Sequence, residues 1–176
     1  MDHLFYATID SDIGRLFVAA TPRGLCCLRF LDNAPPGEVE QTLAELRKKF
    51  GVDPKEDPGA LRELIGQVHE VVAGRLAPTQ VPLDMPGGPF HQKVWQALVR
   101  VPWGQTVSYA ELAKKAGKPR AVRAAASACA RNPVAFIVPC HRVLHSGGGP
   151  GGYFYGLAVK RHLLERETAR PKERAR

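Results

Sequence analysis

Residues 108–129 read SYAELAKKAGKPRAVRAAASAC, and this stretch decides how the second half of the chain folds. Ser108 and Glu111 form the pattern of a capping box, in which the serine hydroxyl accepts from the third helical residue and the glutamate reaches back. We expect that helix to stop at Gly117 and a second helix to open at Pro119. Two short helices joined by a tight turn predict a helix-turn-helix.

The second helix of such a motif is normally the one presented to a DNA groove. Here we expect it to carry Arg120 and Arg123 among small residues such as Ala124. Small side chains allow a close approach to a duplex but offer few groups that read bases, so binding should show little sequence preference. Plain helical bundles also contain such helix pairs, and that alternative stays open on the motif alone.

The distribution of charge favours the DNA-binding interpretation. Residues 1–90 hold 9 Lys and Arg against 13 Asp and Glu, whereas residues 91–176 hold 16 against 4. A basic half of this kind is typical of a module that binds a polyanion, and nucleic acid is the commonest polyanion. The alternative is a solvated basic face that serves solubility.

Three prolines and two glycines between residues 81 and 89 oppose regular structure and indicate a domain boundary. The first domain is expected at 1–84, the linker at 85–89 and the second domain at 90–168. The basic segment 169–176 is expected to be a disordered tail.

Periodicity predicts an α/β first domain and a mostly α second domain. Short β-prone runs separated by turn residues indicate a small antiparallel sheet, followed by two helices. A further helix should open at Pro89 with an apolar stripe that faces a core. The strands are expected at 5–9, 15–20 and 25–30, the two helices at about 38–50 and 60–75, and the stripe comprises Phe90, Val94, Leu98 and Val101.

Four cysteines in 176 residues do not form a secreted disulfide framework, so we expect reduced thiols and a cytoplasmic location. The start, residues 1–4, lacks a basic region before an apolar one, and no apolar run approaches the roughly 20 residues that span a bilayer. The adjacent Cys26 and Cys27 are expected to point to opposite faces of a strand, one of them buried, rather than to bind zinc.

Residues 139–143 read PCHRV and follow the apolar run 134–138, which we expect to be extended. The thiolate is the reactive form of cysteine, and a free thiol titrates near about 8.5. His141 and Arg142 are therefore expected to favour ionisation of Cys140, which predicts an activated nucleophile. An inert cysteine packed after a strand is the alternative.

Several separated motifs of this chain resemble the O6-alkylguanine-DNA alkyltransferases. They are the stretch 139–143, the preceding Arg131-Asn132-Pro133, the helix-turn-helix, and the closing Gly151-Gly152-Tyr153 with residues 163–167. The resemblance covers about residues 89–168. It implies a ribonuclease H-like first domain and a winged helix-turn-helix in the second.

The resemblance also implies the reaction. Such a protein flips a damaged guanine out of duplex DNA and moves its O6-alkyl group, chiefly methyl, irreversibly onto Cys140. O4-alkylthymine as a second substrate stays open. No cofactor and no metal are expected, and the partner is double-stranded DNA containing O6-alkylguanine, with no membrane. We expect a monomer, and cooperative binding along DNA stays open.

Roles follow for individual residues on the same resemblance. His141 would take the proton of Cys140 through a water, Glu167 would orient the imidazole, and Asn132 would brace the turn around the cysteine. Tyr109 would assist base flipping and Arg123 would fill the vacated space. The remaining expected contacts are Val143, Tyr153, Phe154 and Tyr155 to the base, and Ser108, Arg120, Ala124 and Arg131 to the DNA.

The segment 146–156 departs from the family pattern. Phe154 and Tyr155 stand where some members carry Ser and Gly, so Tyr155 adds bulk to the pocket. We expect a preference for methyl over benzyl lesions. The glycines before Tyr153 should let this segment move as a lid.

Three other functions remain open from the residues alone. A non-catalytic winged-helix DNA-binding protein would share the basic helices but would not need Cys140, His141 and Glu167 together. A damage sensor would lack the acceptor thiol. A thiol hydrolase would use Cys and His but should turn over repeatedly.

Overall fold

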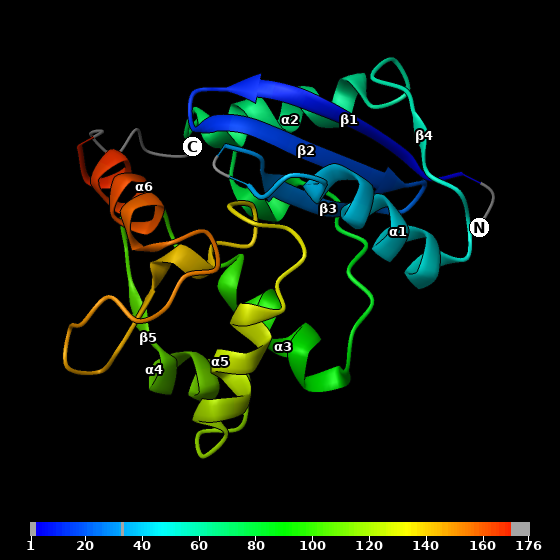
Figure 1. The fold of residues 1–176 in the computed structure, drawn as a ribbon. Coiled ribbons are helices and arrows are strands. Elements are labelled where there is room, and N and C mark those ends of the chain that lie inside the picture. The colour runs from blue at the N-terminus through cyan, green and yellow to red at the C-terminus, as the bar shows by residue number, and fades with distance from the viewer. Residues whose placement is uncertain (1–2, 33, 170–176) are drawn as a thin grey trace. The chain divides into compact units, whose positions relative to one another are not determined.

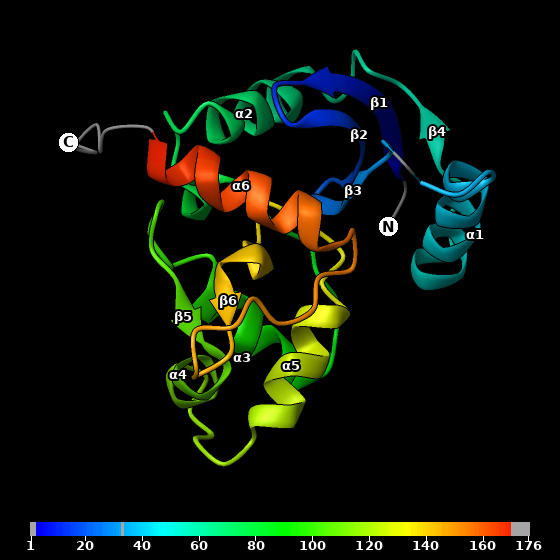
Figure 2. The same cartoon turned by 60° about the vertical axis from the view of Figure 1, so that its left-hand side comes forward.

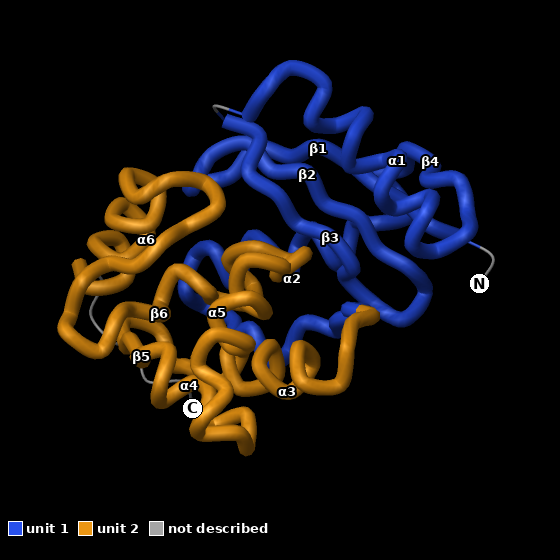
Figure 3. The backbone as a smooth tube through the Cα atoms, turned by 60° about the horizontal axis from the view of Figure 1, so that its bottom comes forward, with its two compact units in different colours: residues 1–85 blue, residues 86–176 orange. Residues whose placement is uncertain are grey.

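The computed structural model describes residues 3–32 and 34–169. The chain folds into two compact units, residues 1–85 and 86–176 (Figure 3). Within the described ranges, every helix is too short or too polar to cross a membrane. Of the tail expected at 169–176, Ala169 ends a helix and the rest lies outside the described residues.

The first unit is built on a four-stranded sheet in the order β3-β2-β1-β4 (Figure 1). The expected antiparallel strands form, and a fourth short strand pairs parallel to β1, so the sheet is mixed. The strands are β1 (Phe5–Ser11), β2 (Gly14–Thr21), β3 (Gly24–Phe30) and β4 (Lys55–Glu56).

Helices α1 (Glu38–Phe50) and α2 (Arg62–Val72) lie on opposite sides of this sheet (Figure 2). Leu46 of α1 packs with Phe17 and Ala19 in a buried cluster, while α2 buries Val68, Val71 and Val72. Both faces of the sheet are therefore covered by apolar side chains. A short 3-10 helix, η1 (Pro78–Gln80), follows α2.

One detail of the first unit differs from expectation. Cys26 and Cys27 are both buried in one cluster, because β3 bulges there: Ala19 pairs with Cys27 and Ala20 with Leu25, which leaves Cys26 as the extra residue. Residues 82–84 contact the sheet of the first unit. Leu83 bridges to Leu25, so this segment runs along the edge of β3.

The second unit contains four α-helices, a 3-10 helix and two short parallel strands within the described residues (Figure 2). β5 and β6 pair beside the helix-turn-helix formed by α4 and α5. The elements are α3 (Pro89–Leu98), β5 (Val107–Ser108), α4 (Tyr109–Lys115), α5 (Val122–Ala130), η2 (Cys140–Arg142), β6 (Val143–Leu144) and α6 (Leu157–Ala169).

The capping box at the start of α4 is confirmed. Ser108 Oγ accepts from the Glu111 amide at 3.1 Å, and the Glu111 carboxylate accepts from the Ser108 amide at 2.6 Å. At the other end Gly117 has a φ of 82°, and the Lys118 amide donates to the Ala113 carbonyl at 3.0 Å. This geometry ends the helix because a left-handed residue is needed there, as glycine supplies.

The second helix of the motif begins later than expected. α5 starts at Val122 rather than at Pro119, because the Ala121 amide donates to the Lys118 carbonyl at 2.9 Å and closes a turn with Pro119 in its second position. Arg120 consequently lies in the turn, whereas Arg123 lies in the first turn of α5.

The apolar run 134–138 is not a strand. It forms buried turns in which the Val138 amide donates to the Val134 carbonyl at 3.0 Å, and Phe136 has a positive φ of 66°. A non-glycine residue in this region is strained and is found where the surrounding structure holds it. The expected extended segment before Cys140 is therefore wrong.

Candidate functional site

Cys140 opens η2 and is half-buried. The Asn132 side-chain amide donates to its Sγ at 3.3 Å and to the Val138 carbonyl at 2.7 Å. The amide oxygen of Asn132 accepts from the Val134 backbone at 3.0 Å. Asn132 therefore holds the buried turns and the thiol in one arrangement.

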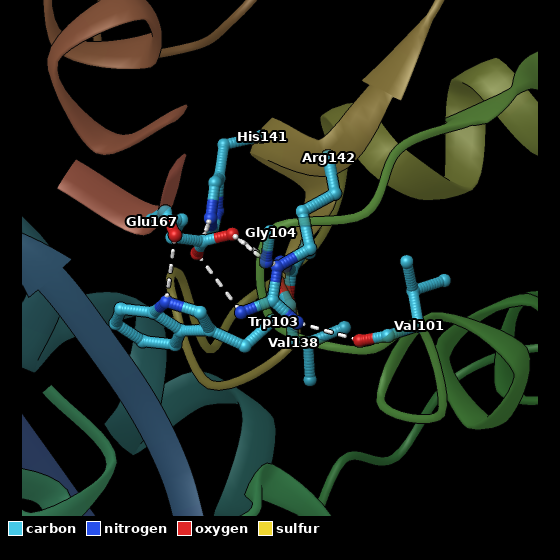
Figure 4. Close-up of polar contacts among 8 residues, drawn as sticks. Val101, Trp103, Gly104, Val138, His141, Arg142 and Glu167 are labelled. Atoms are coloured by element: carbon cyan, nitrogen blue, oxygen red, sulfur yellow. Dashed lines mark hydrogen bonds and ion pairs between the residues drawn. The ribbon is translucent and has the colours of Figure 1, made fainter. Parts of the chain in front are cut away.

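Glu167 is the centre of a buried polar network that includes His141 and Arg142, the two residues after Cys140 (Figure 4). Its Oε1 accepts from His141 Nε2 at 2.7 Å and from Arg142 at 2.9 Å. Its Oε2 accepts from Arg142 Nε at 2.9 Å and from the Gly104 amide at 3.2 Å. Trp103 Nε1 donates to the Glu167 backbone carbonyl at 3.0 Å. Every oxygen of this buried residue thus has a donor.

The pairing determines the charges in the network. Burial opposes ionisation of Glu167, but hydrogen bonds from His141 and Arg142 outweigh it and lower the pKa of Glu167 to about 2. Burial lowers the pKa of His141, although Glu167 acts in the opposite direction. We take His141 as neutral, so Arg142 is the cation that balances the carboxylate.

The neutral imidazole has one possible tautomer here. The Glu167 carboxylate can only accept, so Nε2 of His141 carries the proton and Nδ1 carries a lone pair. Nδ1 is buried and has no hydrogen-bond partner among the residues that the structure describes. The ring stacks on Phe136 at 5.4 Å between centroids with planes 3° apart, which fixes its orientation. The arrangement leaves an unused acceptor on the imidazole of the residue that follows Cys140.

The expectation that His141 and Arg142 favour ionisation of Cys140 is wrong for this structure. Both side chains face Glu167 instead of the thiol. Burial raises the pKa of Cys140, while Asn132 and then Lys160 act to lower it. The thiol is therefore protonated until a base removes its proton.

Lys160 is a residue of this site that sequence reasoning missed. It is fully buried on α6, and its amine donates to the carbonyls of Val143 at 2.6 Å, Gly152 at 3.4 Å and Pro150. Burial lowers its pKa. Lys160 joins the segment 146–156, called the lid below, to the strand that follows η2.

A sequence signal for this helix face existed. The buried residues of α6 are Lys160, Leu163 and Glu167, which have the spacing of one helix face. A lysine and a glutamate on a face with a leucine indicate buried charged groups that need polar partners. No comparable local signal marks Trp103, Gly104 or the inward position of Arg142.

The lid brings some of the expected residues together and leaves one apart. Tyr153 has a buried hydroxyl without a hydrogen-bond partner among the described residues, and its ring meets Tyr155 at 5.7 Å. Burial and then Cys140 raise the pKa of Tyr153. Tyr109 is half-buried, and its pKa is raised by burial and then by Cys129 and Cys140. Phe154, in contrast, is 75% exposed.

The expected DNA-contacting residues are distributed over the helix-turn-helix. Arg123 and Ala124 are exposed on α5, Arg120 is exposed in the turn, and Arg131 is exposed just after α5. Ser108 is half-buried, and its hydroxyl caps α4. Val143, expected to contact the base, is fully buried in β6. In the two described ranges, no group of three or more His, Cys, Asp or Glu could hold a metal ion.

The fold and site define a class of protein in which a helix-turn-helix unit carries a cysteine beside a buried His-Glu pair. Two family models match the chain: the 6-O-methylguanine DNA methyltransferase ribonuclease-like domain over residues 4–85, and the DNA binding domain of the same family over residues 89–169. The chain belongs to the 6-O-methylguanine DNA methyltransferase family.

Relatives and solved structures agree with this assignment. The chain is 45% identical over 169 residues to the bifunctional transcriptional activator/DNA repair enzyme Ada of Escherichia coli, covering 93% of this chain but only 45% of Ada. It is 41% identical over 167 residues to the methylated-DNA–protein-cysteine methyltransferase of Mycobacterium bovis, covering 95% of this chain and 94% of that protein.

Among solved structures, the O6-methylguanine methyltransferase of Mycobacterium tuberculosis matches with a TM-score of 0.78 and 39% identity, over 97% of this chain and 96% of that one. A structure of the Mycobacterium tuberculosis OGT in complex with DNA matches with a TM-score of 0.74 and 39% identity, over 93% and 92%. The expected fold class, a ribonuclease-like domain followed by a mostly helical DNA-binding domain, is confirmed.

Proposed function

We propose that this protein repairs alkylated DNA directly, by moving the alkyl group of O6-alkylguanine, chiefly methyl, from duplex DNA onto Cys140. The observation that carries the proposal is the unused Nδ1 of His141, the residue that directly follows a cysteine whose thiol Asn132 holds. Family membership and a DNA complex of a related protein support DNA as the partner.

The chemistry follows from the charges in the site. The proton of Cys140 passes through a water to Nδ1 of His141, and Glu167 with its Arg142 partner stabilises the resulting imidazolium. The thiolate attacks the alkyl carbon and forms a C–S bond while the C–O6 bond breaks. The guanine keeps the electron pair of that bond and takes a proton, for which the Tyr109 hydroxyl is the proposed donor.

The stability of the alkylated cysteine explains why each molecule would accept only one alkyl group. A thioether is a poor leaving group, and no step in this chemistry removes the alkyl group from Cys140. Each molecule is therefore consumed by one lesion. We propose that it acts as a monomer on DNA, with the base turned out of the stack so that O6 can reach the half-buried thiol.

Intact mass spectrometry after incubation with duplex DNA containing one O6-methylguanine tests the proposal. The wild-type chain should gain the mass of one methyl group, mapped to Cys140, while Cys140→Ser should gain nothing. Cys27→Ala serves as the matched control, since this thiol lies in the core of the first unit.

Two other outcomes would contradict the proposal. An unmodified protein that still binds the lesion would indicate a damage sensor or a non-catalytic DNA-binding protein. Repeated turnover without stable modification would indicate a thiol hydrolase.

A further inference from the structure

Trp103 is a half-buried residue in the loop before β5. Its Nε1 donates to the backbone carbonyl of Glu167 at 3.0 Å. The last four carbonyls of a helix have no partner in the helix, and this carbonyl lies in the last turn of α6. Residue 171, four positions further on, is a proline without an N–H, so the Glu167 carbonyl needs a donor from elsewhere in the chain. Trp103 supplies that donor.

Gly104 holds the same glutamate by its carboxylate. The Gly104 amide donates to Glu167 Oε2 at 3.2 Å. Gly104 has a φ of 70°, and a Cβ on it would lie 3.3 Å from the Glu167 carbonyl oxygen. Glycine at this position therefore allows both the backbone conformation and the close approach. Residues 103 and 104 together fix Glu167 at its backbone and at its side chain.

The indole ring of Trp103 also contacts other residues around His141. The guanidinium carbon of Arg142 lies 5.7 Å from the ring centroid, within the range of a cation–π contact (Figure 4). Phe136 meets the indole edge-on, with centroids 6.2 Å apart and planes at 80°. Phe136 in turn stacks on the imidazole of His141. Trp103 therefore contacts Glu167, its cation and the ring on which His141 lies.

The carboxylate of Glu167 is the group that makes His141 a better base. Burial lowers the pKa of His141, and the contact with Glu167 raises it. The charges of Arg142 and, from α6, of Lys160 lower it. Phe136 presents an uncharged ring to the imidazole. A carboxylate displaced from Nε2 would therefore weaken the base and destabilise the imidazolium that forms during proton transfer.

We propose that Trp103 is a positioning residue, which keeps Glu167 against Nε2 of His141 and so leaves Nδ1 able to take the proton of Cys140. The step moves one proton from Sγ through a water to Nδ1, and it leaves a thiolate and an imidazolium. This inference rests on the proposed function, because it assigns Trp103 to the activation of the acceptor thiol. Trp103 acts on this step through Glu167.

Trp103→Phe isolates the hydrogen bond, because phenylalanine keeps an aromatic ring beside Arg142 but has no N–H. The full-length variant and the wild type are treated with iodoacetamide, without DNA, from acidic to alkaline pH. The rate of carbamidomethylation of Cys140 is followed by peptide mass. We expect the variant to react about tenfold more slowly at neutral pH, since a general base is worth about 10²–10⁴-fold and only part of this is lost. The two rates should converge at alkaline pH, where hydroxide removes the thiol proton without His141.

Trp95→Phe is the matched control. Trp95 lies on α3, and its Nε1 also donates to a backbone carbonyl of the same unit, that of Ala128, at 2.9 Å. The control should lose a similar amount of stability in thermal unfolding, but the pH dependence of Cys140 should stay as in the wild type. Trp103→Leu, which also loses the ring contacts, should shift the pH profile at least as far as Trp103→Phe.

Methyl acceptance from O6-methylguanine DNA separates this inference from the proposed function. A Trp103→Phe profile that coincides with the wild-type profile would overturn the positioning role, as would an equal slowing at every pH that Trp95→Phe reproduces. If the wild type accepts methyl and Trp103→Phe does so equally fast at neutral pH, the positioning role alone fails. If Trp103→Phe shifts the profile but the wild type never accepts methyl, the positioning of His141 stands and the proposed function alone fails.

Discussion

At the scale of single residues, Glu167 holds the proton on Nε2 of His141 and so leaves Nδ1 to act as the base. Glu167→Gln should remove the only carboxylate on the buried Arg142 within the described network and destabilise the fold by about 3–5 kcal/mol, because the guanidinium keeps its charge without a counterion. Urea unfolding at pH 7 measures this difference. Glu165→Gln, an exposed change on the same helix, should have little effect.

The low pKa of Glu167 also predicts how the stability difference between wild type and Glu167→Gln depends on pH. A carboxyl group whose folded pKa is about 2, below its unfolded value near about 4.3, stabilises the fold above the unfolded pKa and loses this contribution as pH falls through the folded one. The gap between wild type and Glu167→Gln should therefore narrow between about pH 5 and pH 2. A gap independent of pH would contradict the assigned ion pair.

Tyr155 is the residue expected to limit the size of the alkyl group. It is half-buried in the lid and its ring contacts Tyr153. The wild type should be inactivated more slowly by O6-benzylguanine than by O6-methylguanine, and Tyr155→Gly should reduce that difference by on the order of tenfold, since about 1.4 kcal/mol of steric cost corresponds to that factor. Equal inactivation rates of the wild type by the two bases would refute the size argument.

At the scale of elements, α5 should place Arg123 in the gap left by the flipped base. Extrusion costs a few kcal/mol, so Arg123→Ala should slow repair of duplex DNA by on the order of tenfold to hundredfold while reaction with free O6-methylguanine changes little. Arg120→Ala, in the turn before α5, is the matched control and should have a smaller effect. An equal loss on both substrates would contradict the intercalating role.

The lid and α6 are joined by one buried amine. Lys160→Met should leave the carbonyls of Val143, Pro150 and Gly152 without this donor and loosen the lid. Hydrogen exchange should become faster in residues 150–156, with residues 109–115 of α4 as an internal reference. Unchanged exchange in the lid would show that other contacts hold it.

Local signals explain which elements were predictable from sequence. The capping box at Ser108 and the stop at Gly117 depend on neighbouring residues, and both are present in the structure. The start of α5 was misplaced because Pro119 suits a turn as well as a first helical turn. The environment of Glu167 depends on Trp103 and Gly104, more than sixty residues earlier, so periodicity could not reveal it.

At the scale of the whole molecule, the chemistry is concentrated in one unit. Residues 91–176 carry 16 of the 25 Lys and Arg, and residues 86–176 form the unit that contains Cys140, His141 and Glu167. Positive charge that neutralises phosphates makes affinity fall steeply with salt, largely regardless of sequence. We therefore expect the affinity of the protein for DNA to fall steeply as the salt concentration rises.

The count of methyl groups accepted per molecule tests this account most directly. Increasing amounts of duplex DNA carrying labelled O6-methylguanine are added to a fixed amount of the protein, and the label on the protein is measured. Transfer should stop at one methyl per molecule, all of it on Cys140, however large the excess of DNA. A label that stays at zero, or lesions consumed beyond one per molecule, would contradict it.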